Sequence, residues 1–210
     1  MTKTQNNTAL ESGEMLPVME HFYTIQGEGA YTGTPAYFIR LGGCDVGCHW
    51  CDVKESWDPN IHPLHNAREI ADIAASYSKT IVLTGGEPLM WNLAPLTSRL
   101  KEKGCKIHIE TSGAYPMSGH LDWITLSPKK TGLPLEEIYQ KASELKVIIF
   151  NQHDFKFAEE QAAKVNENCM LYMQSEWSKR DKMYPEITDY ILKNPQWRAS
   201  VQTHKYLNIP

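Results

Sequence analysis

The chain has 210 residues, of which 41% are hydrophobic, and its 21 basic and 25 acidic residues leave a formal net charge of −4. A chain of this length can bury one large core and forms a single domain. The nearly balanced charge argues against a nucleic-acid binder that depends on neutralising phosphates. No stretch approaches the roughly 18 consecutive apolar residues that a membrane span needs. We therefore expect neither a nucleic-acid nor a membrane partner.

The amino-terminal stretch MTKTQNNTALESGE contains no apolar run of the kind that a signal peptide carries. We interpret residues 1–14 as a flexible tail and residues 15–210 as one domain. Without an export signal the expected location is the cytoplasm, where cysteines are more often metal ligands or catalytic groups than disulfide partners. Cys105 and Cys169 lie in separate apolar stretches, and we expect both to be inert buried thiols.

Short apolar runs alternate with amphipathic segments along the chain. The expected strands are 36–41, 80–83, 106–109, 123–126, 145–150, 170–173 and 198–202. Helical spacing of apolar residues occurs between them, at 66–77, 93–104, 134–145, 155–166 and 184–194. Strands that alternate with helices indicate an α/β fold with a parallel sheet and right-handed crossovers. A partly closed (β/α) barrel and an open doubly wound sheet both fit this order.

Polar, chemically reactive stretches come directly after six of the expected strands. They read GGCDVGCHWCD, TGGEP, ETSG, SPKK, QSEW and THK. In parallel α/β folds the loops at the carboxyl ends of the strands converge on one face, where active sites are assembled. Ordinary turns are also rich in Gly, Ser and Pro, but six such loops on one rim predict an enzyme.

The loop after the first expected strand holds Cys44, Cys48 and Cys51, three of the five cysteines of the chain. Zinc, an iron–sulfur cluster and a redox thiol pair are all compatible with such thiols. Structural zinc sites have four ligands, usually in two separated pairs, and no second Cys/His pair with that spacing follows. A 4Fe–4S cluster ordinarily takes four cysteines. Three cysteines would leave one iron open to a small chelating molecule.

This Cys-x3-Cys-x2-Cys pattern, with an aromatic residue before its last cysteine and TGGEP at the next strand end, resembles the radical S-adenosylmethionine (SAM) superfamily. Within it, FYTIQGEGAYTGTPAYFIRLGGC, CHWCD, LTGGEP, IETSG, LSPK and QTHKYLNIP resemble the 7-carboxy-7-deazaguanine synthase family, from Met19 to Pro210. The resemblance implies a shortened, partly open (β/α) barrel with parallel strands, in a homodimer. It also implies a lyase that contracts the ring of 6-carboxy-5,6,7,8-tetrahydropterin to 7-carboxy-7-deazaguanine with loss of ammonia, in queuosine or other 7-deazapurine biosynthesis.

For the cofactors, the resemblance implies a 4Fe–4S cluster on Cys44, Cys48 and Cys51, with SAM bound to the open iron. Cleavage of SAM would give a 5′-deoxyadenosyl radical that takes hydrogen from the substrate, and the electron would come from a donor such as flavodoxin or ferredoxin. Gly86 is expected to approach the methionyl ammonium closely, which a residue without a side chain permits. The residues that the resemblance assigns to SAM are Trp50, Cys51, Asp52, Gly86, Glu110, Thr111, Ser112, Ser127, Pro128, Lys129, Gln174, Ser175, Glu176 and Trp177.

For the pterin, a planar fork at Arg40 suits its carboxylate, although Arg40 is also compatible with a structural salt bridge at the barrel mouth. The carboxylate of Pro210 is expected to accept hydrogen bonds from pterin N–H groups, the alternative being a frayed terminus. His204 and Lys205 are our candidates for assisting ammonia loss or binding the substrate carboxylate. The residues that the resemblance and the pterin's donors and acceptors assign to substrate are Ile25, Gln26, Gly27, Glu28, Arg40, Thr84 and Pro210.

One position departs from the family pattern. Relatives usually read CDT after the last cysteine, and that threonine hydroxyl helps to hold a Mg²⁺ ion that bridges to the substrate, whereas this chain reads CDV, with Val53. A valine side chain has no lone pair, and Mg²⁺ requires oxygen ligands. Either Asp52, water and substrate hold the ion or the enzyme needs it less. We expect Mg²⁺ as a cofactor on which this enzyme depends only weakly.

Two other functions stay open at this point. An activase of glycyl-radical enzymes is also a small radical SAM protein, but its substrate is a protein backbone, which gives QGEG and THKYLNIP no role. A non-catalytic iron–sulfur or zinc protein would not cleave SAM.

Overall fold

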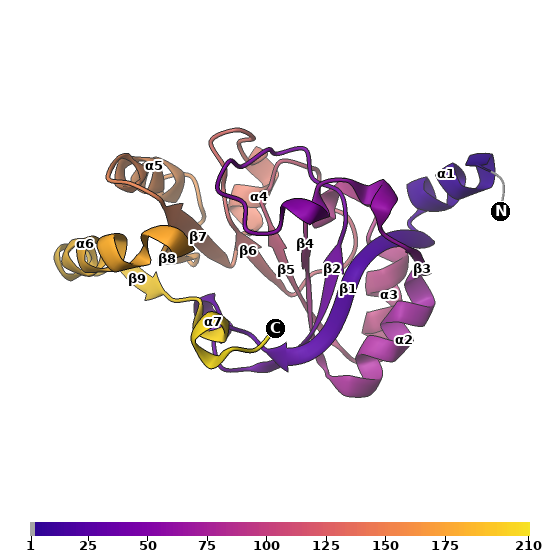
Figure 1. The fold of residues 1–210 in the computed structure, drawn as a ribbon. Coiled ribbons are helices and arrows are strands. Elements are labelled where there is room, and N and C mark those ends of the chain that lie inside the picture. Colours follow the sequence, from indigo (N-terminus) through magenta and orange to yellow (C-terminus); the bar gives the residue numbers. More distant parts are fainter. Residues whose placement is uncertain (1–2) are drawn as a thin grey trace.

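In the computed structural model, which describes residues 3–210, nine strands form one sheet in the order β3-β1-β2-β4-β5-β6-β7-β8-β9 (Figure 1). β1 runs antiparallel to β2 and β3, and all further neighbours from β2 to β9 are parallel. The sheet stays open, with β3 and β9 at its edges, so the predicted partly open α/β barrel is confirmed. The strands are β1 (Met15–Ile25), β2 (Pro35–Leu41), β3 (Leu64–Asn66), β4 (Thr80–Gly85), β5 (Lys106–Thr111), β6 (Trp123–Leu126), β7 (Glu144–Ile149), β8 (Met170–Ser175) and β9 (Trp197–Ser200).

Helices α2 to α6 lie between strands along the chain and cover one face of the sheet, whereas α1 precedes β1 and α7 follows β9. α2 packs on α3, α5 on β7, and α6 on β8 and β9, and Figure 1 shows α5 and α6 at the end of the sheet opposite α2 and α3. None of the helices within residues 3–210 is long and apolar enough to cross a membrane. The helices are α1 (Lys3–Ser12), α2 (Ala67–Tyr77), α3 (Ala94–Glu102), α4 (Glu136–Lys141), α5 (His153–Ala162), α6 (Arg180–Lys193) and α7 (Thr203–Leu207).

Several sequence predictions need correction. β1 and β3 were not expected, the last strand ends at Ser200 instead of residue 202, and the expected helix 134–145 gives way to β7 from Glu144. Cys169 is only partly buried, whereas Cys105 is buried as expected. Residues 1–2 of the expected tail lie outside the described residues, and the rest of it contains α1; the flexibility of this tail stays a prediction.

Side chains alternate along the strands, so that one face of the sheet carries the core and the other carries the site. Ile39, Leu83, Ile109 and Leu145 are fully buried in the core that the helices cover, and burying each such side chain stabilises the fold by about 1.5–3 kcal/mol. Successive residues of a strand point to opposite faces. The next residue on each of these four strands is therefore on the other face, where Arg40, Thr84, Glu110 and Lys146 line one cavity.

Candidate active site

A cavity of about 270 Å³ opens at the carboxyl ends of the parallel strands, and residues from all six reactive loops line it. This confirms that the loops converge on one rim. Pro128 and Lys205 are the predicted site residues that do not line it. The predicted residues on its wall are Ile25, Gln26, Gly27, Glu28, Arg40, Cys44, Cys48, Trp50, Cys51, Asp52, Thr84, Gly86, Glu110, Thr111, Ser112, Ser127, Lys129, Gln174, Ser175, Glu176, Trp177, His204 and Pro210.

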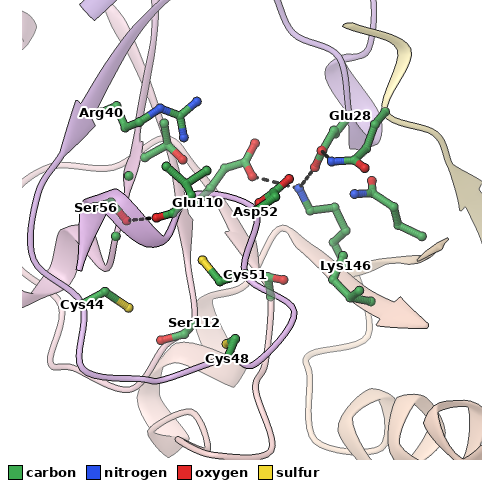
Figure 2. A pocket seen from close by; sticks show the side chains of 18 of the residues that line it. Glu28, Arg40, Cys44, Cys48, Cys51, Asp52, Ser56, Glu110, Ser112 and Lys146 are labelled. Atoms are coloured by element: carbon green, nitrogen blue, oxygen red, sulfur yellow. Dashed lines mark hydrogen bonds and ion pairs between the residues drawn. The ribbon is translucent and has the colours of Figure 1, made fainter. Parts of the chain in front are cut away.

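Figure 2 shows Cys44, Cys48 and Cys51 around the same part of the cavity. A hydrogen bond of 3.1 Å from Cys44 N to the Trp57 carbonyl holds their loop against the following turn, and one of 3.1 Å from Cys51 N to the Cys48 carbonyl closes a turn within the loop. Burial raises the pKa of the Cys44 and Cys48 thiols. Both thiols are therefore protonated near neutral pH, and a bound metal would have to displace their protons.

The donor set fits an iron–sulfur cluster better than a single ion. A tetrahedral zinc site usually has four ligands, and the loop supplies three cysteines. A cluster instead requires thiolates spread around a shared space. The three cysteines on one cavity wall have that arrangement.

Gly86 packs against the cysteine loop. A Cβ atom at this position would lie 2.2 Å from the Gly43 carbonyl oxygen and 2.9 Å from the Cys44 Cβ. The two loops are also joined by a hydrogen bond of 2.7 Å from Glu87 N to the Gly43 carbonyl. Glycine is therefore required here for loop packing, a reason different from the one that we expected. The contact of Gly86 with the methionyl ammonium stays a prediction.

Glu87 follows β4 and joins its loop to the end of β5, a role that was not predicted from the sequence. Its buried carboxylate accepts hydrogen bonds from the Thr111 and Ser112 hydroxyls, from Ser112 N at 2.7 Å and from Leu89 N at 3.0 Å. Thr111 and Ser112 thus line the cavity while their hydroxyls bind a protein carboxylate. The TGGEP motif marks Glu87, but nothing local in the sequence shows that its carboxylate reaches β5.

The residues of the SPK stretch after β6 line two different hollows. Lys129 Nζ donates to the Ser127 carbonyl and hydroxyl, both at 2.6 Å, and lies 5.6 Å from the ring centroid of Trp50. Pro128 lines a smaller hollow of about 70 Å³, whose wall also includes Cys48 and His49. Pro128 is thus not on the wall of the main cavity, and its contact with SAM stays a prediction.

A buried lysine that was not predicted joins two of the predicted acids. Lys146 Nζ donates to Glu110 Oε2 at 2.8 Å and to Glu28 (Figure 2). Gln202 Nε2 donates to Glu28 Oε1 at 2.9 Å, and Gln26 Nε2 donates to Glu110 Oε1 at 3.0 Å. The only signal for Lys146 in the sequence is a lysine within the apolar strand ELKVII.

This ion-pair cluster fixes the charges of its members. Burial disfavours the Glu28 carboxylate, but the Lys146 ammonium outweighs that cost and lowers the pKa of Glu28 to about 2. Burial likewise disfavours the Lys146 ammonium, but the charges of Glu110 and Glu28 raise its pKa above the ordinary lysine value. Glu28 and Lys146 are therefore both ionised at neutral pH.

Arg40 makes the structural salt bridge that the sequence suggested as one alternative, and its contact with the pterin carboxylate stays a prediction. Its Nε donates to Glu20 Oε1 at 2.7 Å, because Glu20 on β1 is the cross-strand neighbour of Arg40 on β2. Arg40 also lines the cavity. Pro210 lines the cavity as well, and its carbonyl oxygen accepts a hydrogen bond of 3.4 Å from the Thr24 hydroxyl.

α7 brings His204 to the cavity and Lys205 to its outer edge. A Cβ on Gly27 would lie 2.2 Å from His204 Nδ1, so the ring packs directly on the chain that follows β1. Burial lowers the pKa of His204, which keeps the imidazole neutral at neutral pH. Lys205 Nζ donates to Asp52 Oδ2 at 2.9 Å and joins α7 to the cysteine loop. A catalytic role for either residue stays a prediction.

The surroundings of Val53 do not fit a Mg²⁺ ion held by the protein. The Val53 carbonyl accepts a hydrogen bond of 2.7 Å from the Ser56 hydroxyl, and the Asp52 carboxylate is paired with Lys205. Mg²⁺ needs near-octahedral oxygen ligands. The side chain of Val53 offers none, and the adjacent oxygens already have protein partners.

Known proteins resemble this chain along nearly its whole length. Residues 38–158 match the Radical SAM superfamily. A 7-carboxy-7-deazaguanine synthase from Flavobacterium psychrophilum is 65% identical over 202 residues, which cover 96% of each chain. The chain belongs to the 7-carboxy-7-deazaguanine synthase family of the radical SAM superfamily. A protein of the same name from Synechocystis sp. is 50% identical and is aligned over 92% of this chain and 93% of its own length.

Comparison with solved structures supports the same family. The crystal structure of QueE from Escherichia coli matches with a TM-score of 0.78 at 30% sequence identity, over 93% of this chain and 97% of that chain. Membership of the radical SAM superfamily implies a 4Fe–4S cluster and SAM. In this member of the 7-carboxy-7-deazaguanine synthase family, Cys44, Cys48 and Cys51 line one cavity together, and their role as ligands of such a cluster stays a prediction.

Proposed function

We propose that this protein is a 7-carboxy-7-deazaguanine synthase, which converts 6-carboxy-5,6,7,8-tetrahydropterin to 7-carboxy-7-deazaguanine with loss of ammonia, a step toward queuosine or another 7-deazapurine. The observation that carries the proposal is one cavity that joins Cys44, Cys48 and Cys51 to Arg40 and Glu28, in a chain 65% identical to a synthase of that name. The cavity has thiols for the cluster on one part of its wall and charged groups for a polar substrate on another.

Cys44, Cys48 and Cys51 would hold the cluster, and residues of the neighbouring loops, among them Gly86, Glu110 and the segment 174–177, would bind SAM. When bound, the reduced cluster and SAM supply hydrogen-abstraction chemistry. The chain itself contributes position and exclusion of water. Trp50 and Trp177 on the cavity wall are suited to that exclusion.

The charges on the wall would orient the pterin. Figure 2 shows Arg40 and Glu28 on opposite sides of Glu110. The substrate carboxylate would lie at the Arg40 guanidinium. The donor N–H groups of the aminopyrimidinone would then face Glu28, Gln26 and Pro210. His204, neutral and next to Gly27, would contact the substrate near the same segment.

Three further features of the proposal come from the family resemblance. These are a flavodoxin or ferredoxin as the electron donor, a homodimer and a cytoplasmic location. Radical SAM chemistry would also require an external one-electron donor, which agrees with the first of them.

The test is anaerobic reconstitution of the full chain with iron and sulfide, followed by reductant, SAM and 6-carboxy-5,6,7,8-tetrahydropterin. The proposal predicts 7-carboxy-7-deazaguanine and 5′-deoxyadenosine by mass spectrometry. Cleavage of SAM without a deazaguanine product would favour another radical SAM enzyme, such as an activase of glycyl-radical enzymes. Absence of SAM cleavage would favour a non-catalytic iron–sulfur protein.

We expect turnover to depend only weakly on Mg²⁺, because Val53 offers no oxygen ligand. Removing Mg²⁺ with a chelator should lower kcat/KM by less than about threefold, whereas V53T should lose more than about tenfold on the same treatment, a difference near 1 kcal/mol in transition-state stabilisation. V46T is the matched control, since Val46 also lines the cavity within the cysteine loop and should gain no such dependence. An absolute requirement for Mg²⁺ in the unaltered enzyme would contradict this prediction.

A further inference from the structure

Lys146 is a buried, charged cavity residue to which the sequence motifs assign no role. Its side chain is 4% exposed, whereas those of its partners Glu28 and Glu110 are 14% and 22% exposed. Lys146 lines the same cavity as the two carboxylates, but its side chain is the least exposed of the three. A bound substrate would meet Glu28 and Glu110 more readily than Lys146.

Four separate parts of the chain meet at this lysine. Glu28 belongs to the loop after β1, Glu110 to β5, Lys146 to β7, and Gln202 precedes α7. The loop after β1 is also tied to itself and to β5, because Gln26 Oε1 accepts a hydrogen bond of 3.2 Å from Glu28 N while Gln26 Nε2 donates to Glu110. The conformation of the loop after β1 is thus linked to the ion pairs of Lys146.

β7 holds the same loop at a second point. Glu144, two residues before Lys146 and on the same face of the strand, accepts a hydrogen bond of 3.0 Å from Ala30 N. Gly29 has φ +65°, and a Cβ there would lie 2.0 Å from Glu144 Oε1. The loop therefore packs directly on β7, which supplies one cation to Glu28 and one acceptor to the backbone of Ala30.

The Lys146 ammonium is needed because the carboxylates of Glu28 and Glu110 lie close together in a largely buried part of the cavity wall. Without Lys146, Glu28 and Glu110 would face each other without the cation that is hydrogen-bonded to both, and one of them would take up a proton or move away. The other charged or titratable groups that face this cluster include Glu144 on β7, Lys129 after β6, His204 on α7, Tyr184 on α6 and His108 on β5. Lys146 is the cation that hydrogen-bonds both carboxylates.

We propose that Lys146 is a positioning residue for the pterin, which keeps Glu28 ionised and in place to accept hydrogen bonds from pterin N–H groups, and which fixes Gln26 through Glu110. This inference rests on the proposed function, because it takes the ligand to be the pterin. Lys146 acts through Glu28 and Glu110 and does not itself contact the substrate. The ion pairs that it makes would set the affinity for the pterin more than the rate of the radical step.

The experiment measures pterin affinity in the cluster-loaded full chain with SAM but without reductant, so that no turnover occurs. Isothermal titration with 6-carboxy-5,6,7,8-tetrahydropterin under anaerobic conditions compares the unaltered protein, K146M, K146R and E28Q. We expect K146M to bind at least about tenfold more weakly, as expected for loss of one charge-assisted hydrogen bond, and K146R to recover most of the affinity. K101M is the matched control, because Lys101 pairs with Asp122 away from the cavity, and its affinity should be unchanged.

The pH dependence of pterin affinity distinguishes a loss of positioning from a general loss of folding in K146M. Between pH 8.5 and 6.5 the affinity of K146M should fall as the pH falls, by up to about tenfold per pH unit, because one carboxylate now takes up a proton. The unaltered protein should show a much smaller change. The double variant K146M/E28Q should bind less than about tenfold more weakly than E28Q, because only the route through Glu110 and Gln26 is left to lose, and it should lose most of the additional pH dependence.

Each outcome bears on one conclusion. Equal affinity of K146M and the unaltered protein would overturn the inference, and so would additive losses in K146M/E28Q. If K146M does not fold, the comparison of K146M/E28Q with E28Q decides alone: a further loss of less than about tenfold supports the inference, and a further loss of about tenfold or more overturns it. Failure of the unaltered, SAM-loaded protein to bind the pterin would instead contradict the proposed function.

Discussion

Replacing Cys48 by serine is expected to abolish product formation. A serine hydroxyl is a poor ligand for iron compared with a thiolate, and two remaining cysteines cannot hold a 4Fe–4S cluster that ordinarily takes four. Turnover should fall below detection, a loss of about 10⁶-fold or more if the acceleration that enzymes typically supply disappears with the cluster. The measurement is iron and sulfide content per chain after anaerobic reconstitution, together with deazaguanine yield.

C169S is the control for that experiment. Cys169 lies outside the cavity wall, and burial raises the pKa of its thiol to about 12, so that it carries no thiolate near neutral pH. C169S should keep both the iron content and the product yield. If C48S retained a full complement of iron and sulfide, Cys48 would not be a cluster ligand and the assignment of the three cysteines would be wrong.

The second large effect is expected at Arg40. If its guanidinium binds the pterin carboxylate through two charge-assisted hydrogen bonds, their loss in R40M costs about 3 kcal/mol, which corresponds to about a 100-fold lower kcat/KM. The loss should appear mainly in KM for the pterin. R40K should recover only part of it, because an ammonium does not have the planar fork of a guanidinium.

E20Q distinguishes substrate binding from a structural salt bridge. Glu20 is 48% exposed and holds Arg40 Nε, and an exposed ion pair contributes only about 0.2–1 kcal/mol to stability. We therefore expect E20Q to change kcat/KM by less than about fivefold, which is 1 kcal/mol or less. If E20Q were as defective as R40M, the importance of Arg40 would lie in its pairing with Glu20 and its assignment to the substrate would fail.

Much of the site can be predicted from the sequence because stretches that follow strands in the chain lie close together in this fold. The reactive stretches follow the strands, and parallel strands bring their carboxyl ends together. That rule alone predicts that the cysteine loop, TGGEP and ETSG meet, and they line one cavity. Alternation within the strands explains why Arg40 and Thr84, which are register partners on β2 and β4, share the cavity face.

The parts that were missed depend on contacts between distant residues or on irregular strands. Lys146 lies 118 positions from Glu28 and 36 from Glu110, so no local pattern reveals its partners. β1 contains Pro17 and changes register between Val18 and Glu20, which hides the alternation that identifies a strand. β3 has only three residues, too few to show any period.

The idea on which the site depends is that three cysteines leave one iron of the cluster free for SAM. The most direct measurement is electron–nuclear double resonance on the reduced, reconstituted protein with SAM that carries isotope labels in its amino nitrogen and carboxylate oxygen. We predict hyperfine coupling from both labelled atoms to the cluster, and loss of that signal when SAM is omitted. A cluster that shows no coupling to bound SAM, with every iron held by the protein, would contradict this assignment.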